Sequence, residues 1–162
     1  MTQKVSKSTS AITGISPSKE ITSAVGAHRD AIRGRAIGMV FQTHNLLHGF
    51  TAKENLDIAV EFSRQTEIKS SSRSIDILKS LGIDRPHTRI DKLSTGEQQR
   101  IASARSLINK PDLILADEMT GNLDENTSDE IINFFLKYID RNNISLLYVT
   151  HNHKYADMAD FK

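Results

Sequence analysis

The chain has 162 residues and no cysteine. It can therefore build neither a disulfide scaffold nor a thiolate metal site, and its composition is compatible with a reducing compartment. It also has no apolar leader segment near Met1 and no apolar run close to the roughly 18 residues that a membrane span requires. We therefore expect the chain to stay in the compartment where it is made and to reach a membrane only through a partner.

The sequence lacks a strong charge of either sign. It has 21 basic residues of the Lys and Arg type and 20 of the Asp and Glu type, so its net charge is +1. This balance gives no global preference for nucleic acid, and we interpret the basic excess in the first quarter as a solvated end. The length and the 38% hydrophobic share are those of one ordinary domain, spanning 1–162.

What the sequence does contain is concentrated between Leu93 and Asp124, in LSTGEQQRIASARSLINKPDLILADEMTGNLD. Ser94 and Glu97 have the spacing of a capping box, which predicts a helix that begins there. The helix should end before the Lys110-Pro111 pair, because the residue before a proline is pushed out of the helical region.

The next segment predicts a strand with two carboxylates at its end. Leu113–Ala116 is an uninterrupted apolar run, as expected of a parallel strand buried on both faces. Asp117 and Glu118 follow at its carboxyl end, where ligands of open α/β sheets collect. An isolated Asp-Glu pair is more often a solvated turn, but the motifs around this pair favour metal and water chemistry.

Three of these motifs, in this order and spacing, resemble the nucleotide-binding subunits of ATP-binding-cassette (ABC) transporters. LSTGEQQR resembles their signature motif, LILADE their Walker B strand and GNLD their D-loop. ADEMTGNLD further resembles the branch that serves lipoprotein release, macrolide export and cell division. The resemblance implies an α/β fold with a P-loop NTPase-like parallel sheet core and a helical ABC subdomain, and ATP and Mg²⁺ as cofactors.

The resemblance also implies a role for each motif. Asp117 would hold Mg²⁺, and Glu118 would be the general base that orients the attacking water. Gln42, after a short β-type run, would meet the metal and this water, and His151, after a later strand, would stabilise the γ-phosphate. Ser94 and Gly96 would present N–H groups to the γ-phosphate that a second protomer holds. The resemblance also implies nucleotide binding by Thr95, Glu97 and Asp124.

The first residues bear on the phosphate site. Lys7, Ser8 and Thr9 resemble the end of a Walker A motif, which implies phosphate binding by all three and Mg²⁺ binding by Ser8. A phosphate loop needs glycines, because they let successive backbone N–H groups turn inward around the phosphate. Residues 1–6 contain no glycine and no evident strand, so the local sequence favours a polar segment over a working cradle.

We expect the fold to be incomplete at both ends, since the family opens with further strands and closes with further strands and a helix. The apolar faces around Val40, Ile114 and Val149 should then be partly uncovered. Within the single domain, 1–42 and 93–162 predict a partial α/β core and 43–92 a helical subdomain.

Further helix starts are predicted by capping patterns at Thr51–Glu54 and Thr127–Glu130. For partners, the resemblance implies a membrane-spanning transporter subunit and a head-to-tail homo- or heterodimer of nucleotide-binding domains, but no nucleic acid. It implies a cytoplasmic location at the inner face of the membrane. Two alternatives stay open: a non-hydrolysing subunit that lends its signature motif in trans, and a non-functional truncated remnant.

Overall fold

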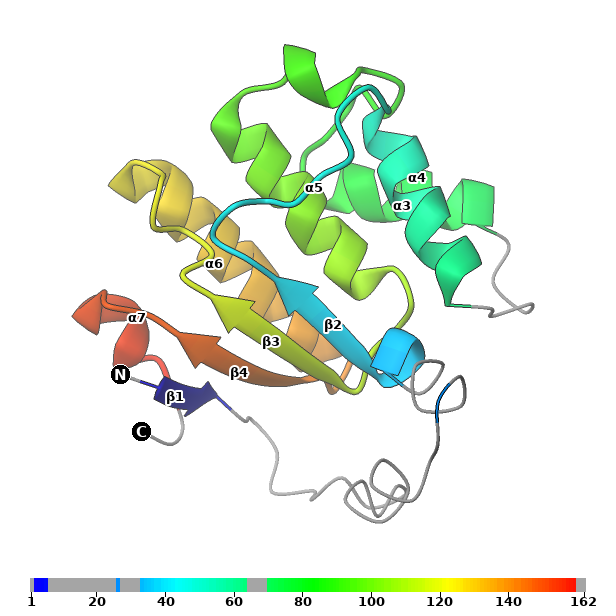
Figure 1. Cartoon of the computed structure of the whole chain (residues 1–162). Helices are drawn as coiled ribbons and strands as arrows, with labels where there is room; N and C mark the ends of the chain where they lie inside the picture. Colours follow the sequence, from blue (N-terminus) through cyan, green and yellow to red (C-terminus); the bar gives the residue numbers. More distant parts are fainter. Residues whose placement is uncertain (1, 6–25, 27–32, 64–69, 160–162) are drawn as a thin grey trace.

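The computed structural model describes residues 2–5, 26, 33–63 and 70–159. In these residues four strands form one sheet in the order β1-β4-β3-β2 (Figure 1). The strands are β1 (Thr2–Val5), β2 (Ile37–Val40), β3 (Leu113–Asp117) and β4 (Ser145–Val149). Strands β2, β3 and β4 run parallel, whereas β1 pairs antiparallel with β4. The expectation that no strand precedes Lys7 was therefore wrong.

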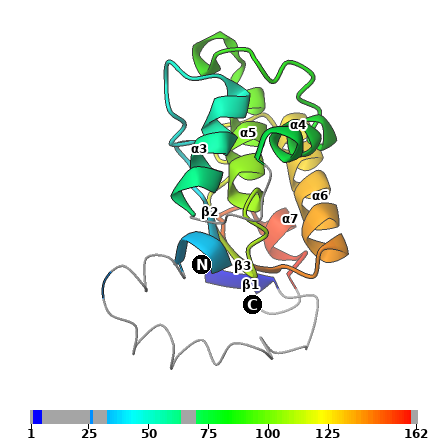
Figure 2. The same cartoon turned by 90° about the vertical axis from the view of Figure 1, so that its right-hand side faces the viewer.

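A short helical segment at residues 33–36 leads into β2, and the other helices lie on one side of this sheet (Figure 2). They are α3 (Ala52–Phe62), α4 (Ser70–Ser80), the short 3₁₀ helix η1 (Ile90–Lys92), α5 (Thr95–Leu107), α6 (Glu125–Arg141) and α7 (His153–Ala156). Helix α5 packs against β2 and also against α3, α4 and α6, so it joins the helical part to the sheet. No helix in the described ranges is long and apolar enough to cross a membrane.

Both capping boxes form as predicted. The Thr51 side chain accepts a hydrogen bond from the backbone of Glu54, and Ser94 does the same for Glu97 at the start of α5. In each case the glutamate side chain accepts the backbone N–H of the cap residue. These bonds satisfy donors that a helix start would otherwise leave unpaired. Helix α6 differs from the prediction: it begins at Glu125 because Asp124 is its cap and accepts the N–H of Thr127 at 3.0 Å.

The buried face of the sheet packs mainly against α6. Val40 and Ile114 are 1% and 0% exposed, so the expectation that they would be partly uncovered was wrong. Their cover comes from apolar side chains of α6, including Ile131 and Phe135. Only Val149 is half-buried as expected.

The other face of the sheet is less covered. Leu113 and Leu115 are half-buried rather than buried, which corrects the prediction of a strand enclosed on both faces. Met39, their neighbour in β2, is 46% exposed.

One glycine permits the close packing of α5 on the sheet. A Cβ at Gly38 of β2 would overlap the backbone carbonyl oxygen of Ser106. Because that oxygen belongs to the helix backbone and cannot rotate away, any larger residue at position 38 would push α5 off β2. This contact fixes the C-terminal half of α5 beside the loop that follows β2.

Candidate functional site

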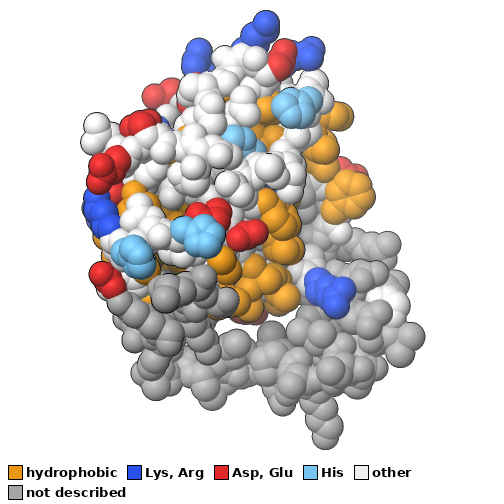
Figure 3. Space-filling model, turned by 60° about the vertical axis from the view of Figure 1, so that its left-hand side comes forward, with side chains coloured by type: hydrophobic (Ala, Val, Ile, Leu, Met, Phe, Trp, Pro, Cys, Tyr) orange, Lys and Arg blue, Asp and Glu red, His pale blue; other side chains and the backbone are white. Residues whose placement is uncertain are grey.

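The parallel strands bring four predicted residues to one edge of the sheet. Asp117 ends β3 and Glu118 follows it, while Gln42 and His151 each lie two residues beyond the last residue of β2 and β4, respectively. Figure 3 views the molecule from the side of these strand ends and shows acidic and histidine side chains close together there. This is the edge at which ligands of such sheets bind.

Glu118 holds the most unusual position in this group. Its backbone N–H still donates to Val149 O at 2.9 Å, but its φ is +44°, a left-handed value that is uncommon outside glycine and asparagine. Its Oε1 is buried and has no hydrogen-bond partner among the described residues. The closest cation candidate is His151 Nε2 at 3.8 Å, beyond hydrogen-bond distance, on a side chain that is 86% exposed.

A buried carboxylate oxygen without a partner is costly, and native structures rarely keep one without a use. The backbone strain at Glu118 points the same way, because such strain collects at functional sites. Both features fit a carboxylate that binds a water molecule or a ligand. They do not fit the alternative of a solvated turn.

The turn after Glu118 closes around Gln42. The Gly121 N–H donates to Glu118 O at 2.9 Å, which forms a tight turn. A Cβ built on Gly121 would lie 3.2 Å from Gln42 Nε2 and 3.6 Å from Glu118 Oε2. Asn122 also donates from Nδ2 to Gln42 O at 3.4 Å. The absence of a side chain at Gly121 therefore allows the amide of Gln42 and the carboxylate of Glu118 to share one small space.

We expect Gly121→Ala to disturb the site and spare the fold. The nearest atom to the new methyl group is the end of the flexible Gln42 side chain, which can move by a few tenths of an ångström. Melting temperature should therefore change by less than about 2 °C, while any hydrolytic activity that uses Gln42 and Glu118 should fall by about tenfold. Gly26→Ala is unsuitable as a control, because a φ of +59° would strain an alanine at that position. Ala116→Gly is the control instead: it creates a small cavity and so shows what a purely structural defect does to melting temperature and activity. Equal activity in Gly121→Ala and wild type would contradict this account.

The signature residues lie elsewhere, in a polar pocket of about 440 Å³ at the start of α5. Its lining comprises Ser94, Thr95, Gly96, Glu97, Arg100, Asn122, Leu123, Asp124 and Thr127. Gly96 is close to the first turn of α6, since a Cβ there would be 2.9 Å from Thr127 Cγ2. The structure therefore brings the signature residues and Asp124 together, but into a pocket whose lining does not include Gln42, Glu118 or His151.

Two of the predicted nucleotide contacts in this pocket already have structural partners. Glu97 accepts the N–H of Ser94 at 2.9 Å and Arg85 Nη2 at 2.8 Å. Burial raises the pKa of Glu97, but the bonds from Ser94 and Arg85 outweigh it and leave the pKa below its ordinary value. The backbone N–H of Thr127 likewise lowers the pKa of Asp124. Both carboxylates are thus charged helix caps, and the positive end of the α5 dipole is the feature of this pocket that favours an anion.

The predicted phosphate residues Lys7, Ser8 and Thr9 lie outside the described residues. Within the described part of the chain, no group of 3 or more His, Asp or Glu side chains could hold a metal ion by itself. Asp117 is exposed at the strand end and is available as one ligand. Sequence reasoning missed Gly121 and Asn122, although they are the first two residues of the GNLD motif.

A charged cluster ties the segment after His151 to α6, and sequence reasoning gave no sign of it. Lys154 Nζ lies 2.6 Å from Asp129 Oδ2, and Tyr155 Oη donates to Asp129 Oδ1 at 2.9 Å. The hydrogen bond from Lys154 lowers the pKa of Asp129. Burial, followed by the bond to Asp129, raises the pKa of Tyr155 to about 12. The cluster holds α7, and with it the His151 turn, against α6.

This cluster predicts a pH-dependent difference between wild type and Asp129→Asn. Because the folded-state pKa of Asp129 is lowered, its contribution to stability is fully present above the unfolded pKa of about 4 and is lost as pH falls through the folded value. The variant should melt about 2 °C lower than wild type at pH 7, and this gap should close as pH drops below about 4. Circular dichroism melts across that range measure it. A gap that stays constant with pH would contradict the assignment to Asp129.

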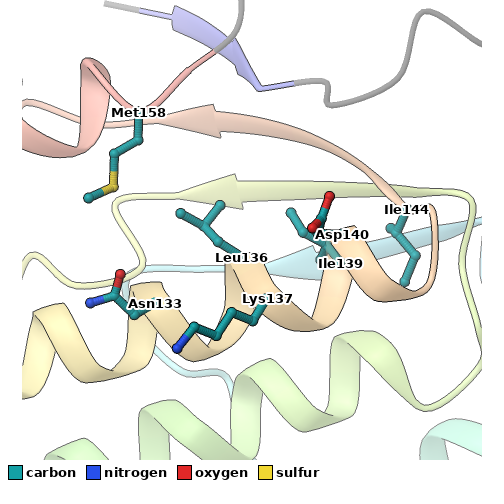
Figure 4. Close-up of a pocket in the computed structure, with 7 residues that line it drawn as sticks. All are labelled: Asn133, Leu136, Lys137, Ile139, Asp140, Ile144 and Met158. Atoms are coloured by element: carbon teal, nitrogen blue, oxygen red, sulfur yellow. The ribbon is translucent and has the colours of Figure 1, made fainter.

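A separate cavity of about 380 Å³ lies between α6 and the segment after α7 (Figure 4). Its apolar lining consists of Leu136, Ile139, Ile144 and Met158, with Asn133, Lys137 and Asp140 as polar members. None of the residues at the strand ends lines it. Its apolar character does not suit a phosphate, and it takes no part in the site described above.

The fold and the residues at its strand ends define an α/β protein with a candidate ligand site at the carboxyl edge of its sheet, and comparison with known families identifies which kind. The sequence profile of the family described as ABC transporter matches residues 5–121, a range that includes Lys7, Ser8 and Thr9. This match covers well over half of the chain. The chain therefore belongs to the ABC transporter family.

Individual relatives agree. The chain is 47% identical over 132 residues to the lipoprotein-releasing system ATP-binding protein LolD of Rickettsia bellii, a match that covers 80% of this chain and 59% of the relative. It is 40% identical over 145 residues to LolD of Cytophaga hutchinsonii, covering 89% and 66% respectively. The chain thus spans about three fifths of the length of the first of these relatives.

Solved structures confirm the expected fold class. The dimeric post-hydrolysis state of the ATP-binding cassette MJ0796 bound to ADP and Pi aligns with a TM-score of 0.75 at 30% identity, covering 85% of this chain and 62% of that one. A second dimeric structure of MJ0796, a bacterial ABC transporter cassette, aligns with a TM-score of 0.75 at 32% identity and covers 85% and 61%.

Proposed function

We propose that this chain is the ATP-binding subunit of an ABC transporter, which couples ATP binding and hydrolysis to transport through a membrane-spanning partner. The observation that carries the proposal is the buried Oε1 of Glu118 at the strand ends, which lies beside His151 and Gln42 and has no hydrogen-bond partner in the described ranges. Family membership and the similarity to LolD support it. They favour an ATP-binding subunit over a non-hydrolysing subunit or a remnant.

In the proposed mechanism, Glu118 is the general base. Its free Oε1 would accept the proton of the attacking water, and its buried position would strengthen that interaction by excluding other water. The amide of Gln42, which shares the space above Gly121, would orient the same water. His151 is exposed enough to reach a γ-phosphate while remaining 3.8 Å from the carboxylate.

The donor set fits a magnesium ion held mainly by a nucleotide. Asp117 and Gln42 offer oxygen ligands at the strand ends, and Ser8 would be a third ligand beside Lys7 and Thr9 at the phosphates. Mg²⁺ keeps several waters and commonly uses only one or two protein ligands beside phosphate oxygens. When bound, it would neutralise the charge that builds on the phosphate during transfer.

We propose that the signature pocket serves a second nucleotide, which a partner cassette holds. The N–H groups at the start of α5 and the positive end of its dipole suit a phosphate. Because the pocket of Ser94–Glu97 and the Glu118 cluster lie in separate places within one chain, each nucleotide would need both protomers. The similarity to two dimeric cassette structures supports a head-to-tail homo- or heterodimer.

The finer part of the proposal concerns where in the cell the chain acts and which branch of the family it serves. The similarity to LolD supports a role in the lipoprotein-release branch, with the chain at the cytoplasmic face of the membrane through its transporter partner. We retain the division into an α/β core (1–42 and 93–162) and a helical subdomain (43–92).

The test is ATP affinity of the purified chain, alone and with a membrane subunit of a lipoprotein-releasing system. The unmodified chain should bind ATP only weakly, since residues 1–6 contain no glycine, and the same chain with a GxxGxGKS loop at its N-terminus should bind it tightly. No ATP binding by the loop-bearing chain in either sample would contradict the proposal.

A further inference from the structure

The loop that follows β2 is held in place by hydrogen bonds from an arginine. We call residues 42–47 the Gln42 loop; it has no regular secondary structure. Arg105, near the C-terminal end of α5, donates from Nη1 to Asn45 O at 2.6 Å and from Nη2 to His44 O at 3.1 Å. A planar guanidinium with donors in a fixed fork suits two neighbouring carbonyls better than any other side chain does. Both bonds are charge-assisted, which is the stronger class of hydrogen bond.

The loop needs such support because of its backbone conformation. Asn45 has a φ of +48°, in the left-handed region that asparagine tolerates but does not prefer. Arg105 itself is half-buried, and this burial lowers the pKa of its guanidinium. Its charge is therefore partly removed from water and is compensated by the two loop carbonyls. Loop and arginine stabilise each other.

Two other side chains fix the ends of the same loop. Asn55 of α3 is 1% exposed, accepts the N–H of Leu47 at 2.7 Å and donates to Leu47 O at 3.2 Å. Asn122 donates to Gln42 O at the other end. Leu47 and Gln42 are thus anchored and Leu46 is buried in the core, so within the loop it is the carbonyls of His44 and Asn45 that Arg105 holds.

We propose that Arg105 is a positioning residue for Gln42: it clamps the middle of the Gln42 loop to α5 and so holds the Gln42 amide beside Glu118. Helix α5 begins with the signature residues and carries Arg105 ten residues later, about 15 Å along its axis. The same helix therefore presents the signature to one nucleotide and sets the glutamine of the other. This last step rests on the proposed function, whereas the clamp itself does not.

The test compares Arg105→Lys with Arg73→Lys in the full chain. Lysine keeps the charge, but its single ammonium group cannot span two carbonyls with fork geometry. Arg73 is the matched control, because it is also half-buried and donates from Nε to Ile108 O at 2.7 Å, at the end of the same helix, without contacting the Gln42 loop. The measurement is hydrogen–deuterium exchange of the peptide spanning 42–50, without nucleotide.

Arg105→Lys should speed exchange in this peptide by about tenfold, the effect of losing one charge-assisted bond from the clamp. Arg73→Lys should leave exchange there unchanged. Equal exchange in both variants would overturn the clamp. If Arg105→Lys does not fold, Arg105→Gln replaces it, and failure of both to fold would also overturn the proposal, since Arg105 would then support the whole domain and not the loop.

An ATPase measurement separates the clamp from the proposed function. In a hydrolysing complex, Arg105→Lys should lower kcat by about tenfold and change the KM for ATP much less, because the Mg²⁺ keeps its other ligands whereas the attacking water loses the Gln42 amide that orients it. Faster loop exchange with an unaltered kcat would overturn the role assigned to Arg105 in positioning Gln42. Faster loop exchange in a chain that stays inactive even with a GxxGxGKS loop and a membrane subunit would support the clamp and contradict the proposed function.

Discussion

Replacement of residues 1–8 by a strand and a GxxGxGKS loop is expected to convert a chain with little Mg-ATPase activity into an active one. Glu118→Gln should then lower the restored activity by about 10²-fold to 10⁴-fold, the usual contribution of a general base. ATP binding should survive this substitution, because glutamine keeps the shape of the side chain and removes only its basicity. Steady-state phosphate release and nucleotide titration measure the two properties separately.

The expected gain in Mg-ATPase activity on replacing residues 1–8 follows from the missing glycines. Residues 1–6 contain none, whereas a phosphate loop uses glycines to turn successive backbone N–H groups inward around the phosphate. Each hydrogen bond to a charged phosphate contributes about 1.5–3 kcal/mol, and three of them contribute roughly 5–9 kcal/mol. Binding of micromolar strength amounts to only about 8 kcal/mol in total. The signature and Glu118 contact the nucleotide from elsewhere and cannot replace this term.

Glu125→Gln is the control for Glu118→Gln. Glu125 is a neighbouring carboxylate in the first turn of α6, its side chain is 78% exposed, and its one ion pair, with Lys154, is long at 3.6 Å. Its substitution should leave hydrolysis unchanged. If the unmodified chain already hydrolyses ATP in a Glu118-dependent manner, Lys7, Ser8 and Thr9 form a working phosphate site without glycines, and our interpretation of this segment is wrong.

Gly96→Asp should lower the ATPase activity of a mixed dimer with an intact LolD-type cassette by about 10²-fold to 10³-fold. The new carboxylate would stand in the signature pocket, where the proposed γ-phosphate must approach. Two like charges about 4 Å apart near a protein surface repel by about 4 kcal/mol, which corresponds to roughly a thousandfold in rate or affinity. The measurement is phosphate release by the mixed dimer.

Packing must be separated from charge in this experiment, because any Cβ at position 96 would crowd Thr127 Cγ2 at 2.9 Å. Thr127→Ser removes that methyl group and keeps the hydroxyl. In the Thr127→Ser background, Gly96→Ala should regain most of the activity, whereas Gly96→Asp should stay inactive. Recovery of Gly96→Asp in the same background would show that crowding alone causes the loss, and the proposed phosphate contact would then be wrong.

The features that could be predicted from the sequence are those with a local cause. The starts of α3 and α5 follow from capping boxes, in which both partners lie within three residues of each other. Strands β3 and β4 follow from apolar runs bounded by turns. The position of Glu118 at a strand end follows in turn from β3, so the chemistry of this edge could be expected before its geometry was known.

The start of α6 was mispredicted because two cap signals compete. Thr127 with Glu130 has capping-box spacing, but Asp124 precedes it and accepts the Thr127 N–H itself. The aspartate takes the helix start one turn earlier and becomes a structural cap. The same aspartate, which the family resemblance assigns to nucleotide contact, thus also has a structural role as the cap of α6.

The contacts that sequence reasoning missed are long-range. Arg105 meets the carbonyl of His44 across 61 positions, and strand β1 pairs with β4 across nearly the whole chain. Neither contact has a local pattern, because a backbone carbonyl leaves no trace in the identity of its residue. The coverage of β3 was misjudged for a related reason: an apolar run shows that a strand can be buried, but not which of its faces another element covers.

The central claim is that one chain supplies Glu118 and the other supplies the signature to each nucleotide, and complementation tests it most directly. The loop-bearing chain is prepared as Glu118→Gln and as Gly96→Asp, each of which should be inactive alone. In a mixed dimer, one of the two sites receives Glu118 from one chain and an intact signature from the other.

With random pairing, half of the dimers are mixed and each has one intact site, so mixing the two inactive proteins should restore about one quarter of wild-type Mg-ATPase activity. If Glu118 and the signature acted within the same chain, no intact site would exist in any dimer. Activity of the mixture no higher than that of the separate variants would contradict the account.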